Sequence, residues 1–407
     1  MSARRTVGGY NDGFARLRGL VNGPRLGAPG SEDPAGVRGE QFGYLAEVDA
    51  AMEASVTAAI SNHLAEVDAS LATFADASRA ASTAGGKRLR PRFAYWAWRC
   101  AVPDTRAMQQ IVGLGAALEL LHAAILVHDD IIDRSELRRG GPSVRAQLAG
   151  HHRDCGWAGS SADFGDHAAL LVGDLLWAAA HDQIDAAVEN LDRNRRRWIV
   201  HSLRAMRAEV VSGQLLELCA QAGGDFSAES ARKILQYKTS SYTVERPVEL
   251  GLLVAGADPS ESEALRRFAR ATGIAFQLRD DLRDLFAVPE DSGKRVGDDI
   301  RSGKPTEMLG TALRLASEPD RETVLEIIGR GEATDDQVVG VRAIFLACGA
   351  VAAVGERIAG LVEIAENALS GMDRGMDEHA IMALRAMMGE CVDLTFLPDV
   401  AQHADVR

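Results

Sequence analysis

The sequence predicts an all-α protein built as a single large helical bundle. From Phe42 onward the chain consists of long stretches rich in Ala, Leu and Glu, with few alternations of β-branched residues. Clusters of Gly and Pro separate these stretches, and no run of short alternating strands is present. A chain of 407 residues, 46% of them hydrophobic, can bury a large core. Together these observations favour a helical bundle.

The helical domain is expected to span residues 41–396. Residues 1–40 are rich in Gly, Arg and Pro and lack periodicity, so we expect a disordered N-terminal tail, and residues 397–407 form a C-terminal tail. The expected helices cover 42–80, 92–102, 107–134, 166–188, 192–221, 227–255, 259–287, 334–371 and 376–393.

Charge and cysteine content exclude several classes of partner. The net charge is −13, whereas a nucleic-acid-binding protein is more often basic, so no nucleic-acid partner is expected. The 5 cysteines are scattered without paired spacing, which fits a reducing, cytoplasmic setting. Charged or polar residues interrupt the most apolar windows, 111–127 and 168–180, so no stable membrane insertion is expected. We interpret the basic run 193–197 as a solvated helix surface.

The strongest chemical signal is an acidic motif, Asp129-Asp130-Ile-Ile-Asp133. On a helix, Asp129 and Asp133 are four residues apart and share one face, with Cβ atoms about 5–6 Å apart. Two such charges repel by about 3 kcal/mol at an effective dielectric near 20, and a bound cation would turn that repulsion into attraction. Carboxylate oxygens suit Mg²⁺. An acidic surface turn would explain this motif alone, but the apolar run 120–127 before it indicates a core-facing helix.

A second copy strengthens the metal hypothesis. Asp280-Asp281-Leu-Arg-Asp284 repeats the spacing on another apolar helix. If the two motifs faced each other across a cavity of the bundle, they could hold divalent ions around one diphosphate. Basic residues that could bind a second diphosphate are also present, at 85–91, Lys238, Lys294 and Lys304.

The chain resembles the polyprenyl diphosphate synthase family, the trans-isoprenyl diphosphate synthases. The matching segments are GGKRLRP at 85–91, LLHAAILVHDDIIDRSELRRG at 120–140, LVGDLL at 171–176, Lys238-Thr239, GIAFQLRDDLRD at 273–284 and GDDIRSGKPT at 297–306. They follow the order of the family. The resemblance implies an isoprenoid-synthase-type bundle with a central apolar cavity.

The resemblance also implies roles by matched position. Three Mg²⁺ ions would be bound by Asp129, Asp133, Asp280 and Asp284. Asp130, Asp281 and Lys238 would support catalysis. Arg138, Lys238, Thr239, Gln277, Lys294 and Lys304 would contact the allylic diphosphate. Lys87, Arg90, His122 and Arg139 would hold isopentenyl diphosphate. A homodimer is implied as well.

The resemblance implies that product length depends on the residues before the first acidic motif. In the family, short-chain members carry an aromatic residue four or five positions before the first Asp. Here Ile125 and Ala124 stand there, so a channel is expected to continue past Leu121 and Leu118. We expect geranylgeranyl diphosphate as product, with geranylfarnesyl or longer products as the alternative. A class I terpene cyclase and a non-catalytic partner subunit are further alternatives, disfavoured because both acidic motifs are present.

Overall fold

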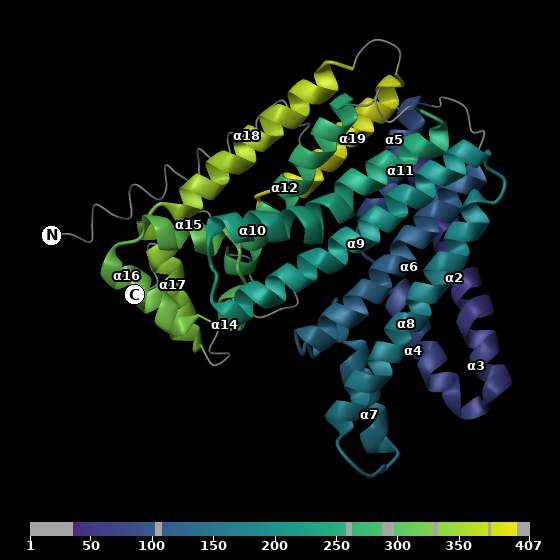
Figure 1. Cartoon of the computed structure of the whole chain (residues 1–407), viewed down its shortest axis with the longest axis horizontal. Coiled ribbons are helices and arrows are strands. Elements are labelled where there is room, and N and C mark those ends of the chain that lie inside the picture. The colour runs from purple at the N-terminus through teal and green to yellow at the C-terminus, as the bar shows by residue number, and fades with distance from the viewer. Residues whose placement is uncertain are drawn as a thin grey trace. The chain divides into compact units, whose positions relative to one another are not determined.

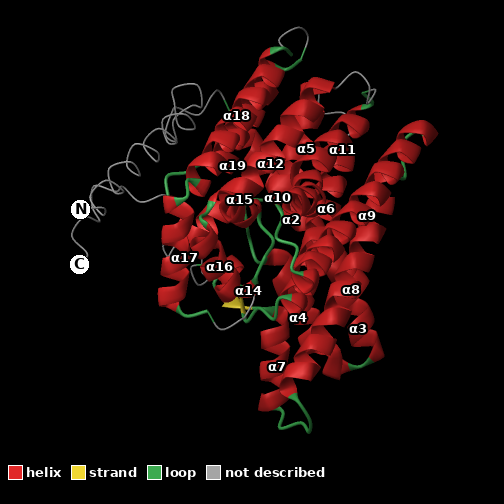
Figure 2. Ribbon diagram, turned by 60° about the vertical axis from the view of Figure 1, so that its left-hand side comes forward, coloured by secondary structure: helices red, strands yellow, loops and turns green. Residues whose placement is uncertain are grey.

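The computed structural model describes residues 36–101, 108–257, 263–286, 297–328, 333–372 and 376–396. It confirms the predicted fold class: the described chain is almost entirely helical, with one short hairpin of two strands (Figures 1 and 2). The chain forms two compact units. Unit 2 contains the described residues of 33–201 and 247–259, and unit 1 contains the described residues of 202–246 and 260–396. The single domain expected over 41–396 and the two tails stay predictions. Helix α2 begins at Val37, inside the expected tail.

Unit 2 holds the first acidic motif on its central helix. Its elements are α2 (Val37–Val56), the π-helix η1 (Thr57–Ser61), α3 (Asn62–Val67), the 3-10 helix η2 (Ala69–Leu71), α4 (Ala72–Thr83), α5 (Leu89–Ala101), α6 (Met108–Ile132), β1 (Leu137–Arg138), β2 (Gly141–Pro142), α7 (Val144–Asp154), α8 (Ser161–Val188), the start of α9 (Arg193–Gly223) and nearly all of α11 (Arg246–Ala255).

Helices α6 and α8 pack side by side and run antiparallel (Figure 1). A Cβ at Gly113, near the start of α6, would lie 3.0 Å from the Cβ of Ala187 at the end of α8. A Cβ at Gly173 would lie 2.3 Å from Nε2 of His128, near the end of α6. Since real Cβ atoms do not approach other atoms that closely, the glycines let the two helices pack tightly. Gly173 belongs to the LVGDLL segment, so its place there has a structural reason.

Aromatic side chains fill the core of unit 2 beside α6. Trp96 and Trp98 of α5 are both 0% exposed, and Tyr95 stacks on Tyr44 of α2 with ring centroids 4.2 Å apart. The Tyr44 hydroxyl donates to the carbonyl oxygens of Pro91 and Ile111, at 3.2 and 3.4 Å. These contacts fix α2 and α5 against α6, which carries the motif.

Unit 1 holds the second acidic motif on α12 (Glu263–Phe286). Its other elements are most of α9, α10 (Ala228–Ile234), the π-helix η3 (Leu235–Glu245), α14 (Asp298–Ser302), α15 (Glu307–Leu315), α16 (Glu318–Ile327), α17 (Asp335–Ala347), α18 (Ala350–Ser370) and α19 (Glu378–Val392).

Several expected helix boundaries were wrong, and each has a local cause. The helix expected over 42–80 is interrupted at Asp68, whose backbone is extended and whose carboxylate accepts a hydrogen bond from the Ser70 amide. The helix expected over 334–371 breaks at Gly349, which has a φ of 81°. Four helices were missed: α7, α14, α15 and α16. Of these, α7, α15 and α16 begin at Ser or Thr caps, namely Ser143, Thr306 and Ser317.

Among the described helices, α6 alone is long and apolar enough by itself to cross a membrane. Its most apolar window is 78% buried inside the protein, as in the core helix of a soluble protein. Helices α17 and α18 pass the same test only when taken together, and they are bent by 63° at the break.

Candidate active site

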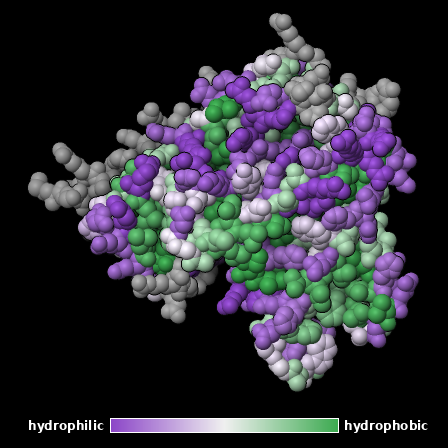
Figure 3. Space-filling view, viewed as in Figure 1, coloured by the Kyte–Doolittle hydropathy of each residue, from purple (hydrophilic) through white to green (hydrophobic). Residues whose placement is uncertain are grey.

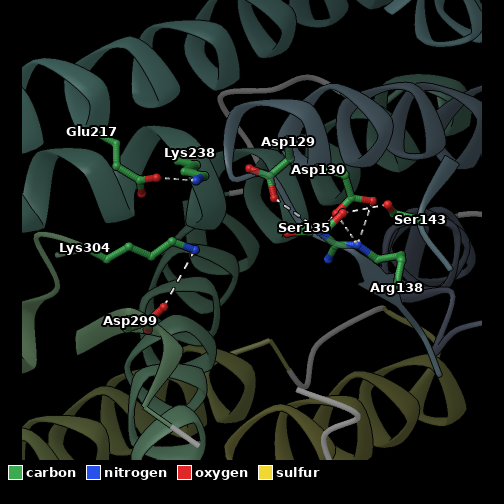
Figure 4. A network of polar contacts seen from close by, with 9 residues as sticks. All are labelled: Asp129, Asp130, Ser135, Arg138, Ser143, Glu217, Lys238, Asp299 and Lys304. Atoms are coloured by element: carbon green, nitrogen blue, oxygen red, sulfur yellow. Dashed lines mark hydrogen bonds and ion pairs between the residues drawn. The ribbon is translucent and has the colours of Figure 1, made fainter. Parts of the chain in front are cut away.

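The first acidic motif lies at the end of α6 in unit 2. Although α6 ends at Ile132, the Asp133 amide donates to the Asp129 carbonyl at 2.8 Å. The helical path therefore reaches Asp133, and the predicted one-turn spacing of Asp129 and Asp133 is present. The Asp129 side chain is 18% exposed, while Asp130 is buried. Figure 4 shows Asp129 and Asp130 with the nearby Arg138.

A tight hairpin brings Arg138 to these acids. Strands β1 and β2 are joined by Arg139 and Gly140, with φ values of 52° and 79°, which is the pattern of a type I′ turn. Ser143, at the far end of the hairpin, donates from Oγ to the Ser135 carbonyl at 2.6 Å. As a result, Nε of Arg138 lies 2.9 and 3.2 Å from the two carboxylate oxygens of Asp130, and Nη2 lies 3.6 Å from Asp129 (Figure 4).

The contact with Arg138 distinguishes Asp130 from the other two aspartates of the motif. Burial lowers the pKa of Arg138, but hydrogen bonds to Asp130 and the charges of Asp129, Asp130 and Asp133 outweigh it, so the net pKa is raised. Arg138 therefore stays charged and compensates the buried Asp130. Asp129 and Asp133 are more exposed than Asp130.

The basic loop 85–91 lies against the same hairpin. Gly85 and Gly86 have φ values of 75° and 123°. The Arg139 guanidinium donates to the Gly85 carbonyl, and a Cβ at Gly86 would lie 3.0 Å from Nη2 of Arg139. Glycine is thus required at 86 both by the backbone and by the neighbouring arginine.

Arg88 ties this loop to the core. Its φ is 47°, an uncommon conformation for a residue with a side chain. Its guanidinium lies 2.9 Å from Glu119 of α6 and 2.9 Å from Asp49 of α2. Glu119 is 3% exposed, so the ion pair compensates a buried charge.

His122 lies on α6 within electrostatic reach of four arginines. Burial lowers its pKa well below the ordinary value, and the charges of Arg90, Arg139, Arg138 and Arg88 lower it further. The imidazole is therefore neutral at pH 7. Arg90 is buried in the first turn of α5, whereas Lys87 is exposed. This concentration of positive charge is suited to a polyanion such as a diphosphate.

The residues expected to set product length lie deeper along α6. Ala124 is 0% exposed, and Leu121 and Leu118 are each 1% exposed. Ile125 is partly exposed. The expected channel and the central cavity stay predictions.

The second acidic motif lies on α12 in unit 1. Gln277 donates to the Asp281 carboxylate at 2.8 Å, which agrees with their four-residue helical spacing. Burial raises the pKa of Asp281 well above its usual range, and the nearby charge of Asp299 raises it further, while the Gln277 hydrogen bond opposes this. Asp280 is 40% exposed and lies 3.0 Å from the Arg279 guanidinium.

Asp284 lies in an even more acidic surrounding. Burial, followed by the charges of Asp299 and Asp298, raises its pKa to about 8, although the Asp299 amide and Lys304 act in the opposite direction. The Asp299 amide donates to the Asp284 carboxylate at 3.2 Å. Lys304 lies 3.7 Å from the Asp299 carboxylate (Figure 4). Lys294 lies outside the described residues.

Lys238 is held in the π-helix η3, a type of turn that often occurs at functional sites. Its ammonium donates to Glu217 of α9 at 2.8 Å (Figure 4). A Cβ at Gly213 would lie 2.3 Å from the Lys238 amide nitrogen, and a Cβ at Gly273 would lie 2.5 Å from Ser240. These glycines let α9 and α12 approach η3 closely. Thr239, next to Lys238, is partly buried.

The donor set of each motif fits a divalent cation. Within the described ranges, no three His, Cys, Asp or Glu side chains are arranged to hold a metal ion by themselves. Each motif offers carboxylate ligands, and at Asp284 burial, followed by the charges of Asp299 and Asp298, raises the pKa. Mg²⁺ fits such a site, because it is commonly held by one or two carboxylates together with water and substrate phosphate oxygens.

Sequence analysis missed four residues of these sites. Arg88 and Glu119 form the buried ion pair, while Glu217 and Asp299 contact Lys238 and Lys304. Asp299 lies in the GDDIRSGKPT segment that was noted for its resemblance but given no role. Glu217 carried no local signal, because its partner is 21 residues away in the chain.

Comparison with known proteins identifies the family of this chain. The family model of polyprenyl synthetase matches residues 72–345. A short chain isoprenyl diphosphate synthase of Methanothermobacter thermautotrophicus is 32% identical over 260 residues, which are 64% of this chain and 73% of that protein. The geranylgeranyl diphosphate synthase of Methanosarcina mazei is 30% identical over 282 residues, which are 68% of this chain and 76% of that protein.

A solved structure extends the likeness to most of the chain. The geranylgeranyl pyrophosphate synthase of Corynebacterium glutamicum, complexed with isoprenyl diphosphate and magnesium, has a TM-score of 0.81 and 30% identity, over 86% of this chain and 98% of that one. The fold, the two acidic motifs and the extent of the family match lead to one conclusion. The chain belongs to the polyprenyl synthetase family and is a prenyl diphosphate synthase, a trans-prenyltransferase.

Proposed function

We propose that this enzyme condenses allylic diphosphates with isopentenyl diphosphate to give geranylgeranyl diphosphate. The observation that carries the substrate assignment is the set of Arg90, Arg138 and Arg139, whose charges act on the neutral His122 beside the first acidic motif. The product assignment rests on Ala124, a small residue at a position where short-chain members of the family carry an aromatic side chain. Relatives range from geranylgeranyl to geranylfarnesyl and nonaprenyl synthases, so a longer product is the second candidate.

We further propose three Mg²⁺ ions, held by Asp129 and Asp133 in unit 2 and by Asp280 and Asp284 in unit 1. Bound magnesium would neutralise the charge of the leaving diphosphate. Asp130 and Asp281 are buried and hydrogen-bonded, so we assign them to positioning Arg138 and Gln277 instead of to metal binding.

We assign the basic and polar residues to the two substrates. The allylic diphosphate would be held by Arg138, Lys238, Thr239, Gln277, Lys294 and Lys304. Isopentenyl diphosphate would be held by Lys87, Arg90, His122 and Arg139. Arg138, Lys238 and Lys304 stabilise the negative charge that develops when the allylic C–O bond ionises. Because His122 is neutral, it would give isopentenyl diphosphate a hydrogen bond without adding a positive charge to that of the arginines.

The second step forms a carbon–carbon bond. The double bond of isopentenyl diphosphate attacks the allylic carbocation, and a proton is then lost to the departed diphosphate. Apolar side chains of α6, such as Leu121 and Ala124, exclude water that would quench the cation to an alcohol.

Product analysis tests this proposal. The protein should be incubated with Mg²⁺, isopentenyl diphosphate and either dimethylallyl or farnesyl diphosphate as primer, and the products dephosphorylated and separated by chromatography. We expect geranylgeraniol from both primers. Geranylgeranyl diphosphate supplied alone should give no hydrocarbon. A main product of farnesyl length or shorter would contradict the length assignment, and a hydrocarbon product would contradict the synthase.

Replacing Arg90 by alanine should raise the KM for isopentenyl diphosphate by about tenfold or more, because a charge-assisted hydrogen bond contributes about 1.5–3 kcal/mol. The KM for the allylic primer should change little. Lys87→Ala should act in the same direction but less strongly, since Lys87 is exposed. A rise in the allylic KM alone would show that the basic residues are divided wrongly.

Arg88→Ala is the matched control for Arg90. It would leave Glu119 buried without its partner, so it should lower the free energy of unfolding by about 3–5 kcal/mol. Thermal unfolding therefore separates the two neighbouring arginines: Arg88 supports the fold, and Arg90 binds substrate.

We also propose a cytoplasmic homodimer. Exposed apolar side chains occur on α8, at Leu170 and Leu171, and on α9, at Val211, Leu215 and Leu218. The three on α9 recur at helical spacing and form one stripe. Figure 3 shows hydrophobic side chains at the surface over these helices. Light scattering should give twice the chain mass at micromolar concentration, and Leu215→Glu with Leu218→Glu should give monomer.

A further inference from the structure

The start of α9 carries a concentration of positive charge in a chain whose net charge is −13. Residues 193–204 contain five arginines and no acidic residue. Arg193, Arg196 and Arg197 are exposed, and so is Trp198, at 55%. We call Arg193, Arg196, Arg197 and Trp198 the α9 basic patch. All four residues belong to unit 2.

The fold itself does not need the arginines of the patch. Asp192 caps α9, accepting hydrogen bonds from the amides of Asn194 and Arg195 at 3.0 Å each. The first turn of a helix carries the positive end of its dipole, so the charges of Arg193 and Arg196 there are unfavourable by about 0.3–1 kcal/mol each. Within the described residues, no ion pair engages the three arginines of the patch.

Arg195, in the same turn of α9, makes the contacts expected of an arginine that stabilises the fold. Its guanidinium lies 3.1 Å from Asp192 and donates to the Val254 carbonyl at 3.2 Å. A Cβ at Gly256 would lie 2.5 Å from it. Its neighbours in the patch make no comparable contacts, so their charge is directed to solvent.

The patch lies at the end of unit 2 opposite to the first acidic motif. Gly113 of α6 meets Ala187 near the end of α8, whereas His128 meets Gly173, so the end of α8 lies near the start of α6. Helix α9 begins shortly after α8 ends. Gly113 and His128 are separated by about 22 Å of helix. A prenyl chain that grows along α6 away from Asp129 would extend toward this end.

We propose that the α9 basic patch docks the enzyme on the surface of an anionic lipid bilayer, with Trp198 among the headgroups. The inference rests on the proposed function for its purpose, since a product with a long apolar tail partitions into a membrane. Arginines attract anionic headgroups, and exposed tryptophan favours the membrane–water interface. The contact is peripheral, so it agrees with the expected absence of stable insertion.

A membrane fits the patch better than a nucleic acid does. The patch is a short row of charges with one aromatic side chain, on a protein that is acidic overall. A protein of net negative charge can bind any anionic surface only through a local patch, and the exposed Trp198 is what favours a bilayer over a nucleic acid. Trp198 would strengthen binding to a bilayer, but it would add little to a contact made by charges alone.

Vesicle co-sedimentation tests the proposal with the full-length protein. Vesicles of phosphatidylglycerol and phosphatidylcholine should bind it at low salt, and vesicles of phosphatidylcholine alone should bind it weakly. The triple variant Arg193→Gln, Arg196→Gln, Arg197→Gln should reduce partitioning by about tenfold or more. Trp198→Ala should also reduce it. The control is Arg266→Gln, Arg267→Gln, Arg270→Gln, which removes three exposed arginines from α12 and should have little effect.

The proposal is overturned if the wild-type protein does not bind the anionic vesicles, or if the two triple variants lose binding equally. It is also overturned if the protein binds heparin or RNA as tightly as it binds the anionic vesicles and Trp198→Ala weakens none of these interactions. The patch would then be a general polyanion site. Activity with a short primer in vesicle-free solution should be the same in all variants. A loss of that activity would concern the proposed function and not the docking surface.

Discussion

Asp129→Ala and Asp280→Ala should each lower kcat by about a thousandfold or more while the fold survives. A metal-bound carboxylate contributes several kcal/mol to stabilising the charge of the leaving diphosphate, and each 1.36 kcal/mol corresponds to tenfold in rate. Both side chains are partly exposed, at 18% and 40%, so their loss leaves no buried cavity. Initial rates in saturating Mg²⁺ and both substrates measure the effect.

The control is Glu263→Ala, an exposed acid at the start of the same α12. It should keep the wild-type rate. The melting temperature of all three variants should stay within about 4 °C of wild type, which corresponds to about 1 kcal/mol in a domain of this size. If Asp129→Ala and Asp280→Ala kept activity within tenfold of wild type, these residues would not hold the metal.

Ala124→Phe should change the main product from geranylgeranyl to farnesyl or geranyl diphosphate. Ala124 is 0% exposed and stands five positions before Asp129 on α6. A phenyl ring there would fill the space into which the prenyl chain grows, and overpacking an apolar site costs about 1–3 kcal/mol or forces rearrangement. Chromatography of dephosphorylated products, with dimethylallyl diphosphate as primer, reads the outcome.

Ala123→Phe provides the matched comparison. Ala123 is 6% exposed, but its side chain points about 100° away around the helix. It should destabilise the protein to a similar extent and leave the product length unchanged. If Ala124→Phe left the product spectrum unaltered, or if both variants shortened the product equally, the channel would not pass Ala124.

The helices that carry chemistry could be predicted from sequence because their signals are local. The spacing of Asp129 and Asp133, and that of Gln277 and Asp281, follows directly from helical geometry. The partners of the basic residues could not be predicted in this way. Glu217 and Lys238 come from different helices, and η3 is a π-helix whose period differs from the 3.6 residues that pattern analysis assumes.

Backbone conformation was the second feature that the sequence patterns did not predict. Arg138 reaches Asp130 only because Arg139 adopts a φ of 52° in the hairpin turn. Side-chain patterns do not reveal that conformation, and an arginine is a poor signal for it. The break at Gly349 is similar, because glycine also occurs inside helices without ending them, as Gly273 does in α12.

The left-handed arginines have a consequence for engineering. Arg88, Arg134 and Arg139 are the non-glycine residues with positive φ in the described part of the chain. Asparagine or glycine would adopt that backbone more easily, so Arg139→Asn should relieve strain at the turn. The same change would remove one of the cations that we propose to bind isopentenyl diphosphate. A search for thermostable variants would therefore tend to select this position and yield proteins that withstand heat better but bind isopentenyl diphosphate less well.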